Sequence, residues 1–175
     1  MLAAPYSILR AITRANPSHT AVRDAHGAYS YAEMLARSRA VAAQLTRNGP
    51  LVSPDSRQPR IGVLTRKDHT WVESMLAAWH LGAIAVPLAE AYPASELEYV
   101  LKATGASAVV AGPSLMATVA GPAANLNINV LEHKPAPPGA PIPSHESLPS
   151  LEGRTDADGA YIIFTSGTTG TYVHG

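Results

Sequence analysis

Hydrophobic positions along the chain follow two spacings, one typical of amphipathic helices and one typical of buried strands. Apolar residues recur three and four positions apart in segments that predict helices at 8–12, 31–47, 71–82, 93–104 and 114–120. Short apolar runs between these segments predict strands at 61–64, 84–86, 108–110 and 128–131. Because strands alternate with helices, the pattern predicts βαβ units and an α/β fold with a mainly parallel sheet.

Turn residues predict where several of these elements begin and end. Residues 21–24 and 28–31 flank His26-Gly27, a pattern typical of a hairpin. The helix over 31–47 is expected to end at Asn48-Gly49-Pro50, and Pro87 is expected to halt the strand at 84–86. The first segment of the chain therefore predicts a hairpin that leads directly into a long helix.

The strongest chemical signal is a strand-like run followed by a loop of hydroxyl and glycine residues. Tyr161–Phe164 is rich in β-branched and aromatic residues, which predicts a buried strand. The six residues after it are Thr165, Ser166, Gly167, Thr168, Thr169 and Gly170. Hydroxyls donate hydrogen bonds to anionic oxygens, and glycines let backbone N–H groups approach a ligand closely. The run predicts a polyphosphate-binding loop, with a generic polar turn as the alternative.

A change of composition divides the chain. Prolines are frequent from Pro135 to Pro143, so the stretch 134–159 is expected to be an extended linker. We therefore predict three parts: an α/β subdomain over 1–133, the proline-rich linker over 134–159, and a strand with the phosphate-binding loop over 160–175.

Composition narrows the class of protein. The chain has 175 residues, of which 46% are hydrophobic and 15% charged, as expected for a globular domain with a sizeable core. Thirteen basic residues balance thirteen acidic ones, so no net charge favours binding to nucleic acid or to an anionic membrane. The absence of cysteine excludes disulfides and thiolate metal sites. No apolar stretch approaches the ~20 residues that cross a bilayer.

Residues 1–23 carry arginines but no acidic residue, which weakly resembles a mitochondrial transit peptide. An ordinary first helix is the favoured interpretation, because Ile8, Leu9 and Ile12 fall at helical spacing. We therefore expect a cytoplasmic protein, with a mitochondrial location as the alternative.

The remaining polar and aromatic residues give no second site. The seven histidines lack metal-ligand spacing and are expected to be surface or hydrogen-bonded residues. Trp71 and Trp79 share a helical stripe with Met75, which predicts core packing. Solvated positions at helix ends or polar faces are expected for Asp68, Glu73, Glu96 and Glu98.

Three patterns, in order along the chain, resemble the adenylate-forming acyl-CoA synthetase (AMP-dependent synthetase/ligase) family. Thr165–Gly170 is similar to the phosphate loop of that family, Ser30–Met34 to an early motif, and Trp79–Leu88 to a motif that ends in Val-Pro-Leu. Residues 85–100 most resemble the malonyl-CoA and methylmalonyl-CoA synthetase branch. The resemblance covers the first part of the large N-terminal domain of the family.

This resemblance implies a two-step ligation that uses ATP with Mg²⁺ and coenzyme A. A carboxylate attacks the α-phosphate of ATP to form an acyl-adenylate, and the thiol of coenzyme A then displaces AMP. By position, Thr165–Gly170 would hold the ATP phosphates. The implied partners are a small carboxylic acid and coenzyme A, and no catalytic or metal-binding residue is assigned within the chain.

One departure from the family pattern limits this expectation. Where the family has Pro-Lys-Gly, the chain has Tyr172-Val173-His174, so an aliphatic side chain stands at the lysine position. The later motifs of the family are not matched. We therefore expect these 175 residues alone to be an inactive, truncated part with an unpaired sheet edge and a tendency to aggregate. The alternatives are a non-catalytic nucleotide-binding or regulatory module, associated with a full-length relative, and an incomplete gene product.

Overall fold

The computed structural model describes residues 5–52, 58–143, 148, 155 and 158–164. The helices are α1 (Pro5–Arg14), α2 (Tyr31–Arg47), α3 (His69–His80), α4 (Ala94–Thr104) and α5 (Met116–Asn125), with a 3₁₀ turn η1 (Pro113–Leu115) before α5. The strands are β1 (Thr20–Asp24), β2 (Gly27–Ser30), β3 (Arg60–Leu64), β4 (Ile84–Pro87), β5 (Ala108–Ala111) and β6 (Asn129–Glu132). The predicted α/β fold is confirmed, and β4 includes Pro87, which was expected to lie beyond it.

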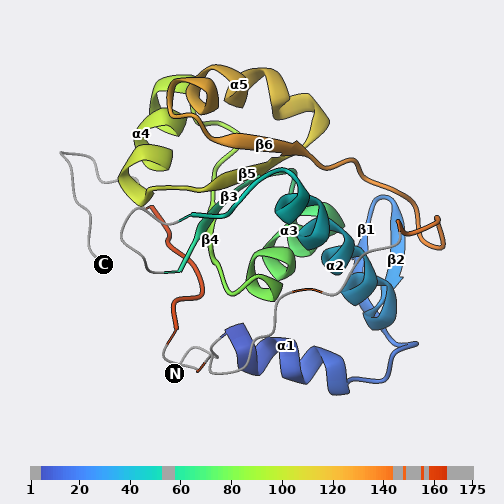
Figure 1. The fold of residues 1–175 in the computed structure, drawn as a ribbon. Helices are drawn as coiled ribbons and strands as arrows, with labels where there is room; N and C mark the ends of the chain where they lie inside the picture. The colour runs from blue at the N-terminus through green and yellow to red at the C-terminus, as the bar shows by residue number, and fades with distance from the viewer. Residues whose placement is uncertain (1–4, 53–57, 144–147, 149–154, 156–157, 165–175) are drawn as a thin grey trace.

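Strands β3 to β6 form one parallel sheet in the order β4-β3-β5-β6 (Figure 1). The connection from β3 to its neighbour β4 runs through α3, whereas the next connections, through α4 and α5, lead to the other side of β3. Helices α4 and α5 therefore cover one face of the sheet and α1, α2 and α3 lie on the opposite face. In such doubly wound sheets, ligands bind beyond the carboxyl ends of the strands.

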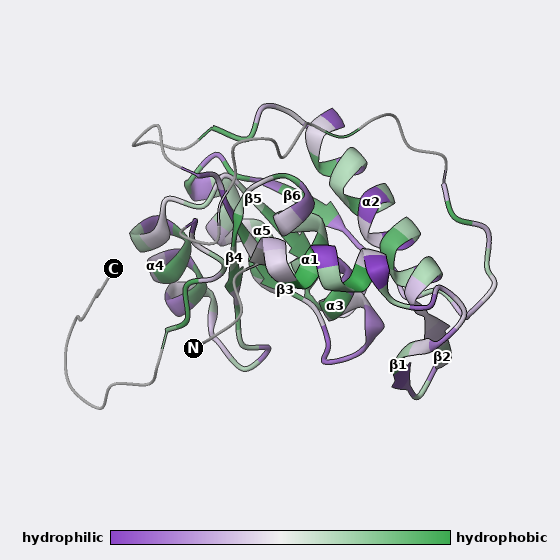
Figure 2. Ribbon diagram, turned by 90° about the horizontal axis from the view of Figure 1, so that it is seen from below, coloured by the Kyte–Doolittle hydropathy of each residue, from purple (hydrophilic) through white to green (hydrophobic). Residues whose placement is uncertain are grey.

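The core consists of two apolar clusters, one on each face of the sheet. In β5, Ala108 and Val110 face the cluster with α1, α2 and α3, whereas Val109 and Ala111 face the cluster with α4 and α5. The alternation follows from the two-residue period of a strand. All four residues are at most 3% exposed, so the strand is buried on both faces. Figure 2 shows that the strands of the sheet are among the most hydrophobic parts of the chain.

The hairpin and the long helix form as the turn residues predict. Strands β1 and β2 pair antiparallel across the turn before Gly27. Ser30 then caps α2, because its hydroxyl accepts the Glu33 N–H over 3.2 Å while the Glu33 carboxylate accepts the Ser30 N–H over 3.1 Å. This capping box satisfies two donors that the first turn of a helix otherwise leaves free.

Residues 134–143, the first described stretch of the proline-rich segment, are bound to the hairpin and to α2. Ala136 accepts a hydrogen bond from the Tyr29 hydroxyl over 2.9 Å, and Pro137 accepts one from Arg37 Nη2 over 2.8 Å. The Gly139 N–H donates to Glu33 Oε1 over 2.7 Å. These bonds hold residues 136–139 against elements that lie about a hundred positions earlier in the sequence.

Two expectations about local environment are wrong. Tyr161–Phe164 is not a buried strand: it contributes a single parallel bridge, Tyr161 with Ala85, and Ile163 is 62% exposed. Glu73 is not solvated but 1% exposed. Arg37 of α2 and His133, directly after β6, both contact its carboxylate. In both cases elements distant in the sequence decide the burial.

Candidate functional site at the carboxyl end of β4

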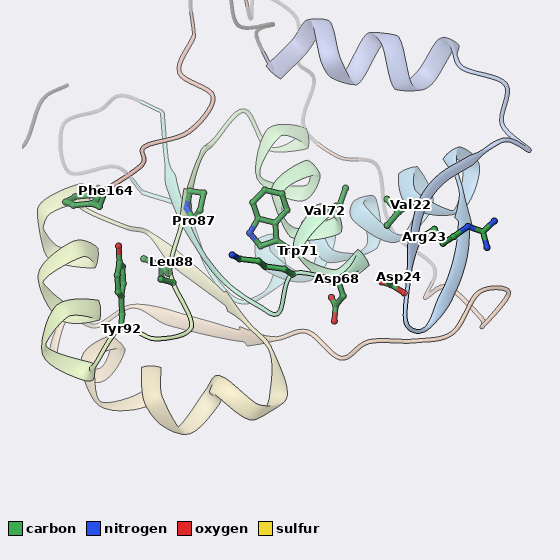
Figure 3. Close-up of a pocket in the computed structure, with 12 residues that line it drawn as sticks. Val22, Arg23, Asp24, Asp68, Trp71, Val72, Pro87, Leu88, Tyr92 and Phe164 are labelled. Carbon is green, nitrogen blue, oxygen red and sulfur yellow. The ribbon is translucent and has the colours of Figure 1, made fainter. Parts of the chain in front are cut away.

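A pocket of about 530 Å³ lies beyond the carboxyl ends of β3 and β4. Its walls come from the hairpin, the β3–α3 connection, α3, the residues after β4 and the last described residue of the chain. The lining residues are Val22, Arg23, Asp24, Lys67, Asp68, Trp71, Val72, Pro87, Leu88, Ala89, Tyr92 and Phe164. Figure 3 shows Trp71 between an apolar side, with Phe164, Tyr92 and Leu88, and an acidic side, with Asp68 and Asp24.

Asp24, one of the charged residues of the pocket, accepts three hydrogen bonds. Its Oδ2 accepts the His69 N–H over 2.7 Å and His69 Nδ1 over 2.8 Å, and its Oδ1 accepts the His26 N–H over 2.8 Å. Partial burial opposes ionisation of the carboxyl group, but these bonds outweigh it and lower the pKa of Asp24 to about 2. Asp24 therefore presents a fixed negative charge at neutral pH.

Asp24, Asp68 and His69 are the one group of possible metal ligands found among the described residues. The His69 ring is nevertheless engaged on both sides, since Nδ1–H donates to Asp24 and Nε2 accepts the Ala136 N–H over 3.4 Å. Asp68 Oδ1 caps α3 by accepting the Thr70 N–H over 2.9 Å. Hydrogen bonds within the fold therefore account for the close approach of these three side chains, and we assign no metal to them.

The predicted phosphate-binding residues, Thr165 to Gly170, lie outside the described residues, and so does Val173. The structure places the segment directly before them. Residues 160–162 run parallel to β4, and Phe164 packs edge-on against Tyr99 of α4 with ring centroids 6.3 Å apart. The described part of the chain therefore ends at Phe164, which lines the pocket beyond the carboxyl end of β4.

Most of the chain matches a model of one enzyme family. The description of that family is AMP-binding enzyme, and the match covers residues 9–171. The chain belongs to the AMP-binding enzyme family. This membership confirms the resemblance expected from the phosphate-loop, early and Val-Pro-Leu motifs.

The AMP-binding relatives include malonate–CoA ligases. The chain is 32% identical over 150 residues to the mitochondrial malonate–CoA ligase ACSF3 of Homo sapiens, a match that covers 86% of this chain and 26% of the relative. Among solved structures, it is similar to apo MatB from Rhodopseudomonas palustris, with 28% identity, a TM-score of 0.75, and coverage of 96% of this chain and 33% of MatB. The ATP-bound form of MatB gives a TM-score of 0.71 at 28% identity, with coverage of 97% and 33%.

The chain thus spans about a quarter of the length of the curated relative and a third of the solved AMP-binding structure. The family match over residues 9–171 contains the doubly wound sheet and includes the phosphate-loop motif at 165–170. Among the helices that the structure describes, none is long and apolar enough to cross a lipid bilayer.

Sequence reasoning did not find the pocket. Trp71 packs against the core as expected, and Asp68 lies at a helix end as expected, where it caps α3. The sequence did not indicate that both residues also line a pocket. A usable signal exists: Asp68 follows β3 by four residues, and Leu88 and Tyr92 follow β4 by one and five. Residues that follow parallel strands gather at the carboxyl edge of the sheet.

Proposed function

We propose that this chain is the part of an ATP-dependent acid–thiol ligase that supplies its phosphate-binding loop. The proposed reaction activates a carboxylic acid as an acyl-adenylate, with release of pyrophosphate, and transfers the acyl group to coenzyme A. The observation that carries the proposal is the 150-residue similarity to a malonate–CoA ligase. It favours malonate or a related short acid as the substrate of the whole protein, and the mitochondrial name of that relative favours the mitochondrial alternative.

The loop residues have the chemistry that the first step requires. The hydroxyls of Thr165, Ser166, Thr168 and Thr169 can donate to phosphate oxygens, while Gly167 and Gly170 permit close approach of backbone N–H groups. Substitution at phosphorus depends mainly on positioning and on stabilisation of charge. Mg²⁺ would enter with the nucleotide and neutralise part of the phosphate charge. The fixed carboxylate of Asp24 lies in the neighbouring pocket, where it would repel a second anion.

A second candidate function is a nucleotide-binding or regulatory module without catalysis. It is favoured by Val173, which stands where the family pattern has a lysine. Such a module would bind ATP without turnover, alone or together with a full-length relative.

Two measurements on the purified chain test its expected inactivity and the role of the loop. In a thioester assay with malonate, ATP, Mg²⁺ and coenzyme A, we expect no product from the 175 residues alone. Titration calorimetry with Mg-ATP should give micromolar binding that Ser166→Ala with Thr168→Ala weakens and Ser18→Ala leaves unchanged. Turnover would contradict the expected inactivity. Absence of binding would contradict the role of the loop and favour an incomplete product.

A further inference from the structure

The segment that precedes the phosphate-loop motif has few backbone bonds to the sheet. Its pairing with β4 is one parallel bridge, in which the Ala85 N–H donates to Ala160 O over 3.0 Å and the Ile162 N–H donates to Ala85 O over 2.9 Å. A single bridge holds an edge segment weakly, because each exchanged hydrogen bond adds little net stability. Other contacts must therefore hold residues 159–164 in place.

Trp79, near the end of α3, supplies one of these contacts. Its indole Nε1 donates to Ala160 O over 2.8 Å, and the Trp79 side chain is buried. Ala160 O thus accepts two hydrogen bonds, from the Ala85 N–H and from the indole, which uses both of its lone pairs. A buried indole N–H without an acceptor is destabilising, so the packing of Trp79 favours one position of residue 160.

Gln58, two residues before β3, supplies the other contact. The Gly159 N–H donates to Gln58 Oε1 over 2.7 Å, and Gln58 Nε2 donates to Gly159 O over 3.3 Å and to Gly82 O over 3.0 Å. The side-chain amide therefore pairs with residue 159 as a neighbouring strand would. A Cβ at Gly159 would lie 2.8 Å from Ile84 Cδ1, so a larger residue there would require the Ile84 side chain to shift.

We propose that Trp79 and Gln58, the Trp79–Gln58 clamp, are positioning residues for the phosphate loop. This inference rests on the proposed function, in which Thr165–Gly170 binds the ATP phosphates. The clamp holds residues 159 and 160, and Phe164 on α4 fixes the other end of the segment, directly before Thr165. Because hydrogen-bond donors act only within a narrow range of distance from phosphate oxygens, a displaced segment weakens ATP binding.

The test compares two clamp variants with a control in the full chain. Trp79→Phe removes the indole N–H and keeps an aromatic ring, and Gln58→Leu removes both bonds to Gly159. The control, Ser38→Ala, removes a buried hydroxyl that lies 3.2 Å from His80 Nε2, outside the clamp. The hydrogen-exchange rate of the Ile162 amide measures how firmly residues 159–162 are held against β4. Titration with Mg-ATP measures the affinity of the phosphate loop. Thermal unfolding shows whether the control loses as much stability as the clamp variants.

Each clamp variant should speed Ile162 amide exchange and weaken ATP binding. Trp79→Phe should change both by about five-fold, the effect of one lost hydrogen bond, and Gln58→Leu, which loses more bonds, by at least as much. Ser38→Ala should leave both the Ile162 exchange rate and the affinity for Mg-ATP unchanged, apart from any effect of its own loss of thermal stability. Unchanged exchange in both variants would overturn the clamp. Faster exchange with unchanged ATP affinity would overturn its positioning role. If the unaltered chain does not bind ATP, the proposed function fails with that role, while the exchange data still decide whether the clamp seats residues 159–162.

Discussion

At the scale of single residues, the charge of Asp24 depends on neighbours that are close in space. Two of its three hydrogen bonds come from His69, which lies 45 positions later in the chain. Tyr29 stacks on the His69 ring with centroids 4.2 Å apart and an interplanar angle of 23°. The hairpin and the start of α3 are therefore joined by one ionised carboxylate and one buried imidazole.

Asp24→Asn tests this junction. The variant loses charge-assisted bonds, so the free energy of unfolding at neutral pH should fall by about 2 kcal/mol. The pKa of Asp24 in the folded chain, about 2, lies below the ordinary aspartate value of 3.8. The ionic contribution to stability is therefore complete above the unfolded pKa and is lost as the pH falls through the folded pKa. The difference between the chain and the variant should therefore shrink as the pH falls from about 4 towards 2.

Urea unfolding across this pH range measures the difference. Glu90→Gln is the matched control, because Glu90 forms only a 4.0 Å pair with Arg66 and both side chains are solvent-accessible. It should change stability by less than about 0.5 kcal/mol. A gap between Asp24→Asn and the unaltered chain that stays constant down to pH 2 would contradict an ionised Asp24.

Val173 gives a second prediction at this scale, drawn from the sequence because the residue lies outside the described part of the chain. A lysine there would restore the cation that the family pattern has next to the phosphate loop. We expect Val173→Lys to tighten binding of Mg-ATP by about ten-fold at low salt, and less at high salt, since screening weakens exposed charges. Val173→Gln, of similar length but uncharged, should have little effect in the same titration. Equal affinities for Lys and Gln variants would argue against a phosphate next to position 173.

At the scale of elements, α2, α3 and the end of β6 meet at Glu73. His133 Nε2 lies 2.6 Å from Glu73 Oε2, and Arg37 Nε lies 3.9 Å from Glu73 Oε1. Arg37 also donates from Nη2 to Pro137 of the proline-rich segment. One buried carboxylate thus joins two helices, a strand end and the segment that follows it.

Removing this carboxylate should destabilise the junction strongly. Glu73→Gln removes the carboxylate that pairs with Arg37, a side chain only 7% exposed, and we expect a loss of about 3 kcal/mol. Glu73→Gln with Arg37→Met should recover part of that loss, which a double-mutant cycle in urea measures. The exposed pair Glu132–Lys134 at 3.2 Å supplies the control, since Glu132→Gln should cost less than about 0.5 kcal/mol. Additive effects of the two core substitutions would show that Glu73 and Arg37 do not interact.

At the scale of the whole molecule, local patterns predict the elements but not their surroundings. The helix over 31–47 was predicted with its observed bounds, because Ser30 caps it and the apolar spacing within it is local information. Glu73 was misjudged because its partners lie 36 and 60 positions away. Tyr161–Phe164 was misjudged because β-branched and aromatic content reports strand propensity, whereas burial requires a covering neighbour. The position of Thr165–Gly170 stays a prediction, and the pocket beside Phe164 required the assembled sheet.

The exposure of residues 160–164, beside β4, also depends on contacts between elements that are distant in the sequence. Residues 160–162 add one bridge to β4, and Ile162 and Phe164 pack towards α4. The two-residue period of the segment places Tyr161 and Ile163 on the other face, where they are 38% and 62% exposed. No strand of the described residues pairs with the outer side of this segment, and an apolar edge of this kind favours pairing with another copy of the chain.

We therefore expect the 175-residue chain to self-associate as its concentration rises, and Ile163→Lys to suppress that association, because a charge on an edge strand opposes strand pairing. Val52→Lys is the matched control: Val52 is 64% exposed, as accessible as Ile163, but its carbonyl accepts the Ser107 hydroxyl at the start of β5 and it lies outside the edge segment. Sedimentation velocity over a range of concentrations measures the association. A chain that stays monomeric, or a control that suppresses association as well as Ile163→Lys does, would show that the edge beside β4 is not the surface that drives it.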